Sequence, residues 1–287
     1  MLKISELCKS YKSCKALNKF SFSFESGIYA LLGPNGSGKS TLMNVLTNNL
    51  ISDSGDISLD GERISEMKDR YFEQIGYMPQ YCPLYLNFKA IEMLYYIAEL
   101  KGVKRDEAKK QAFELLSAVE LTECKDQYIK TFSGGMKQRL SLICAMLGKP
   151  KILLLDEPSA GLDPKQRIVI RNVLSSAALD STLIIATHIV SDIEYTAKEA
   201  ILLKKGEIVD HGHPDALAGK MSGRVWSIEC DTEKAERMKS EFPIVNIIKS
   251  GNGVKIKLLS DIRPDAEAEE AEPTLEDYYL SVFGGAV

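Results

Sequence analysis

The stretch GPNGSGKST at 33–41 constrains this chain more than any other. It follows the apolar run IYALL at 28–32 and leads into LMNVL at 42–46, so the pattern predicts a strand, a glycine-rich loop and a helix. A loop that encloses phosphates must point its backbone N–H groups inward, and glycines permit that conformation. The helix that begins near Lys39 adds free N–H groups and the positive end of its dipole. We therefore predict that the loop binds a nucleoside triphosphate through Gly33, Pro34, Asn35, Gly36, Ser37, Gly38, Lys39, Ser40 and Thr41.

Two side chains of this loop have distinct expected tasks. Lys39 can reach the β and γ phosphates, and the hydroxyl of Ser40 can ligate Mg²⁺. A plain glycine-rich turn is the alternative interpretation, but the flanking strand and helix are those that a phosphate-binding loop requires. The lysine after the last glycine also distinguishes the loop from the dinucleotide-binding pattern G-x-G-x-x-G.

The segment ILLLDEP at 152–158 supplies the carboxylates that phosphoryl chemistry needs. Asp156 ends an apolar run and can bind Mg²⁺ through water. Glu157 follows it and can polarise a water molecule aligned with the γ-phosphate. An acidic pair at the end of a strand is weak evidence by itself, because turns often contain Asp and Glu. After a phosphate-binding loop on an adjacent strand, it predicts nucleotide hydrolysis.

Composition restricts the class of protein. The 287 residues are 45% hydrophobic with a net charge of −4, which indicates a globular chain and argues against a nucleic-acid platform. The six cysteines (Cys8, Cys14, Cys82, Cys124, Cys144, Cys230) form no C-x-x-C pair, so we expect reduced thiols and no zinc site. The N-terminus lacks the apolar core of a signal peptide, and no apolar run approaches the ~20 residues that span a bilayer. We expect a cytosolic protein that reaches a membrane through a partner.

The hydrophobic pattern predicts an α/β layered domain over residues 25–190. Continuous apolar runs at 28–32, 152–155 and 182–186 indicate buried parallel strands, whereas alternation at 2–8 and 19–24 indicates half-exposed strands. Apolar residues recur at helical spacing over 87–120, 135–147 and 165–178, which predicts helices there.

Beyond residue 219 the composition changes, and the pattern predicts a small β-α-β-β module. Its strands are expected at 224–230, 244–249 and 254–259 and its helix at 232–241. Residues 264–273 are acidic and alanine-rich and are interpreted as a solvated linker. Thr274 and Asp277 then predict the start of a terminal helix that docks on its own domain or binds another chain.

The segment FSGGMKQRL at 132–140 resembles the signature of ATP-binding-cassette (ABC) ATPases. Ser133, Gly134 and Gly135 there precede a helix and can form a second phosphate-binding helix start, although SGG in isolation is only a capped turn. The other family markers occur in order. By this resemblance, Tyr11 would stack on adenine, and Gln80 in YMPQ would link Mg²⁺ and water to a membrane partner. Asp163 lies in the segment SAGLD at 159–163, which resembles the D-loop that crosses a dimer interface. His188 would contact the γ-phosphate.

The resemblance implies a fold and a set of roles. The fold would be a P-loop ABC ATPase core over 1–219, with a mostly parallel sheet, an antiparallel β subdomain and a helical subdomain at about 87–147, followed by a small C-terminal α+β module at 220–287. Without this context, His188 would be interpreted as a structural histidine and Tyr11 as an ordinary strand aromatic. Met136 departs from the glutamine frequent in the family, at a position that varies. The implied catalytic residues are Lys39, Gln80, Glu157 and His188, and the implied Mg²⁺ ligands are Ser40, Gln80 and Asp156.

The resemblance also implies partners. One phosphate loop and one signature per chain imply a dimer, either a homodimer or a heterodimer, that closes on ATP. The ending PTLEDYYLSVFG resembles ATPase subunits of type-2 ABC exporters, which pair with a separate membrane chain. Residues 81–96 would receive that chain's coupling helix, so the protein would lie at the cytoplasmic face of the membrane.

Three other classes of protein are alternatives to this interpretation. A soluble ABC ATPase that acts on nucleic acid or ribosomes stays open as the alternative. A P-loop GTPase is disfavoured because the chain lacks N-K-x-D, and an inactive cassette is disfavoured because Lys39, Asp156, Glu157 and His188 are intact. The resemblance implies that the membrane chain selects the cargo.

Overall fold

The computed structural model describes residues 1–12, 14–81, 83–251 and 253–284. They form two compact units, Met1–Asp210 and His211–Val287. The boundary predicted at 219 therefore differs from the observed division. The short helix α8 (Pro214–Gly219), which the sequence pattern did not predict, belongs to the second unit because it packs against the terminal helix α10 (Leu275–Phe283).

A six-stranded sheet forms the centre of the first unit, where the sequence predicted a mostly parallel sheet. Strand β3 pairs in parallel with both β8 and β9, and β7 pairs in parallel with both β6 and β8. Nearly every residue of β3, β7 and β8 is buried, because both faces of these strands are covered. The strand order is β10 (Glu207–Gly212), β9 (Glu199–Lys204), β3 (Gly27–Leu32), β8 (Thr182–Ala186), β7 (Ile152–Asp156) and β6 (Ile75–Met78).

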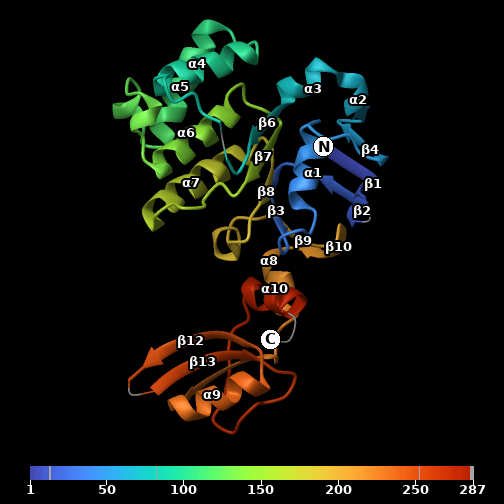
Figure 1. Ribbon diagram of the computed structural model, residues 1–287, viewed down its shortest axis with the longest axis vertical. Coiled ribbons are helices and arrows are strands. Elements are labelled where there is room, and N and C mark those ends of the chain that lie inside the picture. Colours follow the sequence, from blue (N-terminus) through green and yellow to red (C-terminus); the bar gives the residue numbers. More distant parts are fainter. Residues whose placement is uncertain (13, 82, 252, 285–287) are drawn as a thin grey trace. The chain divides into compact units, whose positions relative to one another are not determined.

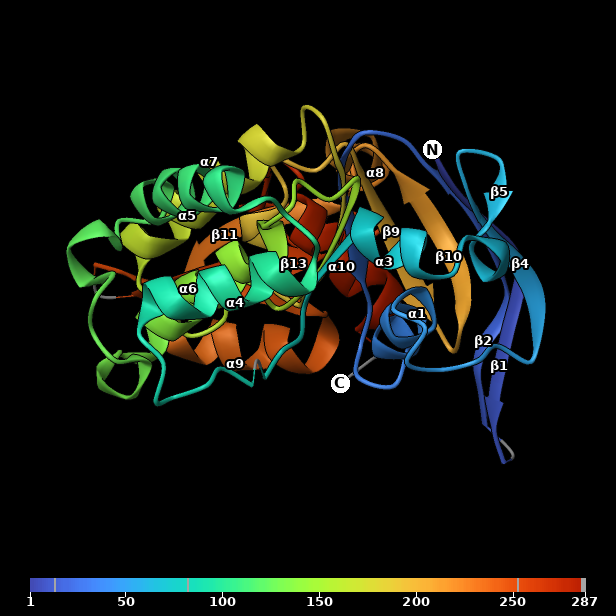
Figure 2. The ribbon, with the colours of Figure 1, turned by 90° about the horizontal axis from the view of Figure 1, so that it is seen from above.

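A second, antiparallel sheet lies beside helix α1 (Lys39–Leu46) in Figure 2. Its order is β2 (Cys14–Phe24), β1 (Leu2–Tyr11), β4 (Ser54–Leu59) and β5 (Glu62–Arg63). Its inward side chains join those of α1 and β3 in one apolar core. The connector after β5 forms short helices α2 (Ile64–Met67) and α3 (Asp69–Gln74), which the sequence pattern did not predict. Buried Tyr71 of α3 holds this connector by donating to the Leu46 carbonyl oxygen at 2.7 Å.

The first unit also contains a group of three helices, α4 to α6, and one further long helix, α7 (Pro164–Ala177). Figure 1 shows α4 (Ala90–Leu100), α5 (Arg105–Ala118) and α6 (Gly134–Met146) together, apart from the antiparallel strands, with β6 to β8 between. Helix α7 (Pro164–Ala177) follows β7. Lys101, just after α4, donates to the Ala145 and Leu147 carbonyl oxygens at the end of α6, at 3.2 and 2.8 Å. This ammonium group caps α6 at the end where its dipole is negative.

The second unit contains the predicted β-α-β-β module. Strands β12 (Ile244–Ser250), β13 (Gly253–Leu259), β11 (Val225–Cys230) and β14 (Glu269–Glu270) lie in that order. Helix α9 (Thr232–Glu241) contributes Ala235 and Met238 to a small core with Ile228, Ile256 and Leu258.

The prediction of a solvated linker at 264–273 is wrong. Strand β14 within it pairs with β11, and Ala268 is fully buried in the module's core. The acidic side chains that suggested a linker are used locally, because Lys234 contacts both Asp265 and Glu267 at 2.9 Å. A small alanine and two paired carboxylates therefore allow this stretch to form an edge strand.

The terminal helix docks on its own module, the first of the two predicted alternatives. Thr274 caps it by accepting from the Asp277 amide, and the Thr274 amide donates to the Asp277 carboxylate at 2.7 Å. Leu275 and Asp277 are fully buried, and Lys257 of β13 reaches Asp277 at 2.7 Å. An apolar anchor and an ion pair thus fix α10.

Two further expectations concern the whole chain. Cys8, Cys14, Cys124, Cys144 and Cys230 are thiols outside any disulfide, as predicted, whereas Cys82 lies outside the described residues. None of the described helices is long and apolar enough to cross a membrane.

Candidate functional site

The predicted site residues gather where three neighbouring parallel strands end. The phosphate loop follows β3, Asp156 and Glu157 close β7, and His188 comes two residues after β8. Carboxyl ends of parallel strands meet at one edge of a sheet, which is where open α/β sheets bind ligands. Register links the segments directly, since Asp156 pairs with Ala186 and the Glu157 amide donates to the Ala186 carbonyl oxygen at 2.9 Å.

The shape of the phosphate loop is set by packing against β2 and β9. Gly38 has a φ of 114°, and a Cβ there would lie closer than 3.0 Å to the Ala16 carbonyl oxygen. A Cβ on Gly33 would approach the Leu203 carbonyl oxygen equally closely. The Gly206 amide also donates to the Ser37 carbonyl oxygen at 2.8 Å. The surrounding sheets therefore hold the loop in shape, while Pro34, Asn35 and Gly36 form an exposed tip.

Lys39 folds back over the loop that precedes it. Its ammonium group donates to the Gly33 and Pro34 carbonyl oxygens at 2.6 and 3.1 Å. Burial lowers the pKa of Lys39, and the nearby charges of Glu157 and Asp156 oppose that shift. The cation therefore stands within electrostatic reach of both carboxylates and above the phosphate-binding backbone.

Asp156 is half-buried, and among the described residues its carboxylate accepts no hydrogen bond. Burial raises its pKa, the charge of Glu157 raises it further, and Lys39 acts in the opposite direction. Such a carboxylate gains by facing a cation. Mg²⁺ is usually held by one or two protein oxygens, with water and substrate phosphates completing the shell. Asp156 and the exposed Ser40 hydroxyl in the first turn of α1 fit that donor set.

Glu157 is buried, with three protein groups aimed at its carboxylate. Thr187 Oγ1 donates to Oε2 at 3.0 Å, and the His188 amide donates to Oε1 at 3.1 Å. His188 Nδ1 lies 2.6 Å from the same Oε1, while the side chain of His188 is 70% exposed. The carboxylate is oriented from one side and the imidazole is open to a ligand. This arrangement suits a group that positions or activates water at an adjoining phosphate.

Two residues of this site were missed by sequence reasoning. Thr187 is buried and joins the Glu157 carboxylate to the Ile189 amide, which donates to Thr187 Oγ1 at 3.0 Å. Gln138 lies in α6 and donates to the Glu157 carbonyl oxygen at 2.9 Å. Their only sequence signal was position, since Thr187 precedes the predicted histidine and Gln138 lies within the SGG segment.

The SGG segment forms the start of α6, next to the start of α7. Ser133 is the N-cap and accepts from the Met136 amide at 3.2 Å. A Cβ on Gly135 would lie closer than 3.0 Å to Gln166 Oε1 of α7, the free end of a flexible side chain, so the two helix starts approach each other closely. Asp163 caps α7 by accepting from the Gln166 amide at 2.9 Å. Ser133 and Gly134 are exposed, and the first N–H groups of α6 are open to an anion.

The other predicted residues are exposed. Tyr11 ends β1, and Gln80 follows β6. The structure thus joins Lys39, Asp156, Glu157 and His188 in one site through contacts and charge, whereas the hydrogen bonds described above connect neither Tyr11 nor Gln80 to it.

The fold and site define a P-loop ATPase. The chain matches the family model described as ABC transporter over residues 17–160, and it belongs to the ABC transporter family. It is 35% identical to the uncharacterized ABC transporter ATP-binding protein YxlF of Bacillus subtilis, over 98% of this chain and 99% of that one. The linearmycin resistance ATP-binding protein LnrL of the same species is 33% identical, over 78% of this chain and 72% of its own length.

A solved structure agrees with the fold. The dimeric post-hydrolysis state of the ATP-binding cassette MJ0796, bound to ADP and Pi, superposes with a TM-score of 0.67. It is 25% identical and covers 74% of this chain and 98% of that chain. The chain is therefore an ATPase of ABC transporters, and the comparisons favour transport-coupled hydrolysis over a non-transport role.

Proposed function

We propose that this ATPase powers export through a separate membrane-spanning subunit, at the cytoplasmic face of the membrane. Similarity over nearly full length to a transporter ATP-binding protein supports this proposal, as does similarity to a resistance ATP-binding protein. The proposal assigns the cargo to the membrane subunit, since the residues of the site described above suit the phosphates of a nucleotide.

The proposed role in ATP hydrolysis rests on the buried carboxylate of Glu157. Thr187 and His188 orient this carboxylate, and Lys39 lies within electrostatic reach of it. In the proposed site, Lys39 and the loop backbone hold the phosphates and Glu157 takes a proton from the attacking water. His188, through its exposed ring, contacts the γ-phosphate. Asp156, Ser40 and Gln80 would hold Mg²⁺, which would neutralise charge on the phosphates.

The exposed start of α6 supports the proposed dimer. Ser133, Gly134 and Gly135 present free N–H groups and complete the ATP site of a second ATPase subunit, identical or not. In this dimer Asp163 faces the partner and Tyr11 stacks on adenine. ATP holds the two subunits together, and hydrolysis releases them.

The test is capture of tagged Glu157→Gln, with ATP and Mg²⁺, from detergent-solubilised membranes of the natural host. Lys39→Ala, which is expected not to bind ATP, is the matched control. Stoichiometric recovery of a multi-spanning protein is the expected result. Recovery of only the soluble dimer, of ribosomes or of DNA would refute the proposed partner and leave the ATPase activity standing.

A further inference from the structure

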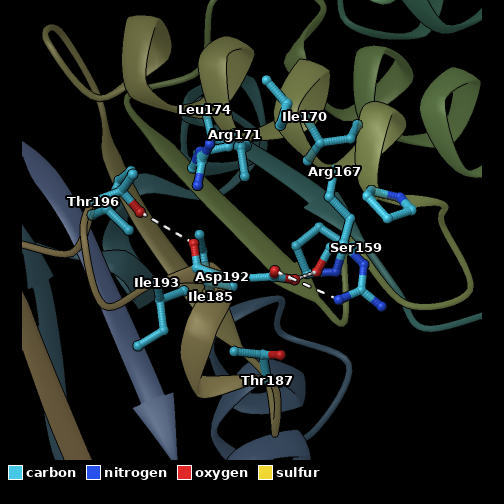
Figure 3. Close-up of a pocket in the computed structure, with 14 residues that line it drawn as sticks. Ser159, Arg167, Ile170, Arg171, Leu174, Ile185, Thr187, Asp192, Ile193 and Thr196 are labelled. Carbon is cyan, nitrogen blue, oxygen red and sulfur yellow. Dashed lines mark hydrogen bonds and ion pairs between the residues drawn. The ribbon is translucent and has the colours of Figure 1, made fainter. Parts of the chain in front are cut away.

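The segments that leave the adjacent strands β7 and β8 are joined at two places. One is the contact of Glu157 with Thr187 and His188 described above. The other lies farther along both segments, where the Ser159 hydroxyl donates to Oδ2 of Asp192 (Figure 3). Ser159 begins the SAGLD segment, and Asp192 ends the short 3₁₀ helix Val190–Asp192 that follows His188. The segments that carry Glu157 and His188 are therefore connected both at these two residues and again at Ser159 and Asp192.

Asp192 is held from several directions. Arg167 Nη1 of α7 lies 3.8 Å from its other carboxylate oxygen, and Arg167 Nε donates to the Leu162 carbonyl oxygen at 3.2 Å. The Asp192 backbone carbonyl accepts from Thr196 Oγ1 at 3.5 Å. The side chain of Asp192 is 21% exposed, and Ser159 is buried. The Ser159–Asp192 bond is therefore sheltered and belongs to a small polar network.

The residues around the Ser159–Asp192 bond indicate how it affects the distance between the segments that follow β7 and β8. A cavity of about 300 Å³ lies between α7 and the segment after β8. Ser159, Arg167 and Asp192 line it, together with Leu174, Ile185 and other apolar side chains (Figure 3). Side chains across a cavity make few direct contacts, so apolar packing fixes the distance between these segments only weakly. The Ser159–Asp192 bond is a direct polar connection between the two segments at this cavity.

We propose that Asp192 is a positioning residue that couples the segment carrying His188 to the segment carrying Glu157 and Asp163. A displacement of 187–192 when His188 meets the γ-phosphate is transmitted through Asp192 to Ser159, and so to the surface that faces the second subunit. This inference rests on the proposed roles of His188 and of residues 159–163. Asp192 is not one of the residues proposed to bind nucleotide or metal.

The primary experiment compares steady-state ATPase kinetics of Asp192→Ala, Ser159→Ala and the double variant with those of the parent. Each single variant is expected to lower kcat about tenfold with KM changed less than about twofold. The double variant should be no slower than the slower single variant, because the Ser159–Asp192 bond is already lost in either single variant. A double variant about a hundredfold slower, or single variants at the parental kcat, would overturn the proposal.

Two further variants separate positioning from general damage. Asp192→Asn retains a side-chain carbonyl that can accept from Ser159, so it should keep most of the parental kcat. Asp180→Asn, an exposed carboxylate beyond the end of α7, is the matched control and should behave as the parent. Loss in Asp192→Asn equal to that in Asp192→Ala would contradict a role through the Ser159 bond. A fall of ATP affinity and melting temperature together in Ser159→Ala would indicate a merely structural residue and also overturn it.

The transmission step is measured by ATP-dependent dimerisation in the Glu157→Gln background, followed by size-exclusion chromatography. Adding Asp192→Ala should raise the ATP concentration at half-dimerisation about tenfold, and adding Asp180→Asn should not. No shift with Asp192→Ala would overturn the coupling. If the Glu157→Gln parent itself forms no dimer with ATP, the proposed dimer fails instead, so the two failures are distinguishable.

Discussion

Gly38→Ala should destabilise the protein even without nucleotide, because the phosphate loop is shaped by packing. The φ of 114° at Gly38 is one that L-residues rarely adopt, and forcing it costs about 1–3 kcal/mol. The new methyl would also lie closer than 3.0 Å to the Ala16 carbonyl oxygen and 3.3 Å from Leu203 Cδ2. Relieving that overlap moves β2 or α1 and adds about 1–3 kcal/mol. We expect unfolding to become easier by about 4 kcal/mol in total.

Gly36→Ala is the matched control within the same loop. Its φ is 78°, and a methyl there meets no heavy atom within 4 Å, so the cost is only the local strain of about 1 kcal/mol. Scanning calorimetry of the first unit's transition, without nucleotide, measures both variants against the parent. A fluorescent ATP analogue then tests binding, which both substitutions should weaken because both alter the loop. Equal destabilisation by the two variants would refute the claim that the sheets, rather than the ligand, impose the loop's shape.

Three further predictions concern other parts of the chain. Glu157→Gln should lower kcat by roughly 10²–10⁴ while nucleotide still binds, and a kcat above a tenth of the parental value would contradict its role as the base. Burial lowers the pKa of Lys101 to about 8, below its unfolded value. Between the folded and the unfolded pKa the unfolded state therefore binds more protons, so the free energy of unfolding rises with pH. Measured by chemical denaturation, the free energy of unfolding of the parent should increase relative to that of Lys101→Met as the pH rises from 8 to 10. A difference between the two proteins that does not change with pH would refute this. Lys257→Met leaves the buried Asp277 unpaired and should cost about 3 kcal/mol and expose α10 to protease. The exposed Lys255→Met is its control, and equal protease resistance of the two variants would refute the ion-pair role of Lys257.

The central sheet and its site could be predicted because their signals are local. A buried parallel strand needs a continuous apolar run, and the catalytic edge follows from which residues come directly after such runs. By this rule Lys39, Asp156 and Glu157 are expected to lie at one edge of the sheet. The helices α4 to α6 and the β-α-β-β module are likewise predicted from the spacing of their apolar residues.

The contacts that tune the site could not be predicted because they join distant segments. Thr187 and Gln138 contact Glu157 across 30 and 19 residues, and Ser159 meets Asp192 across 33. Nothing in the local pattern of a threonine, glutamine or serine distinguishes such a partner from a solvated side chain. The error at 264–273 has the same origin, since its acidic composition suggested a linker while the pairing of β14 with β11 depends on residues far earlier in the chain.

The two halves of the site are held by different forces, which separates binding from hydrolysis. The phosphate loop is fixed by steric contact of Gly33 and Gly38 with neighbouring strands, so its geometry exists before ligand arrives. Glu157 and His188 are held by hydrogen bonds between two segments that border a cavity, and such bonds can rearrange at lower cost than a packed backbone. Changes in the loop should therefore alter ATP affinity and stability together. Changes in the hydrogen-bonded half should alter kcat and dimerisation while affinity stays near the parental value.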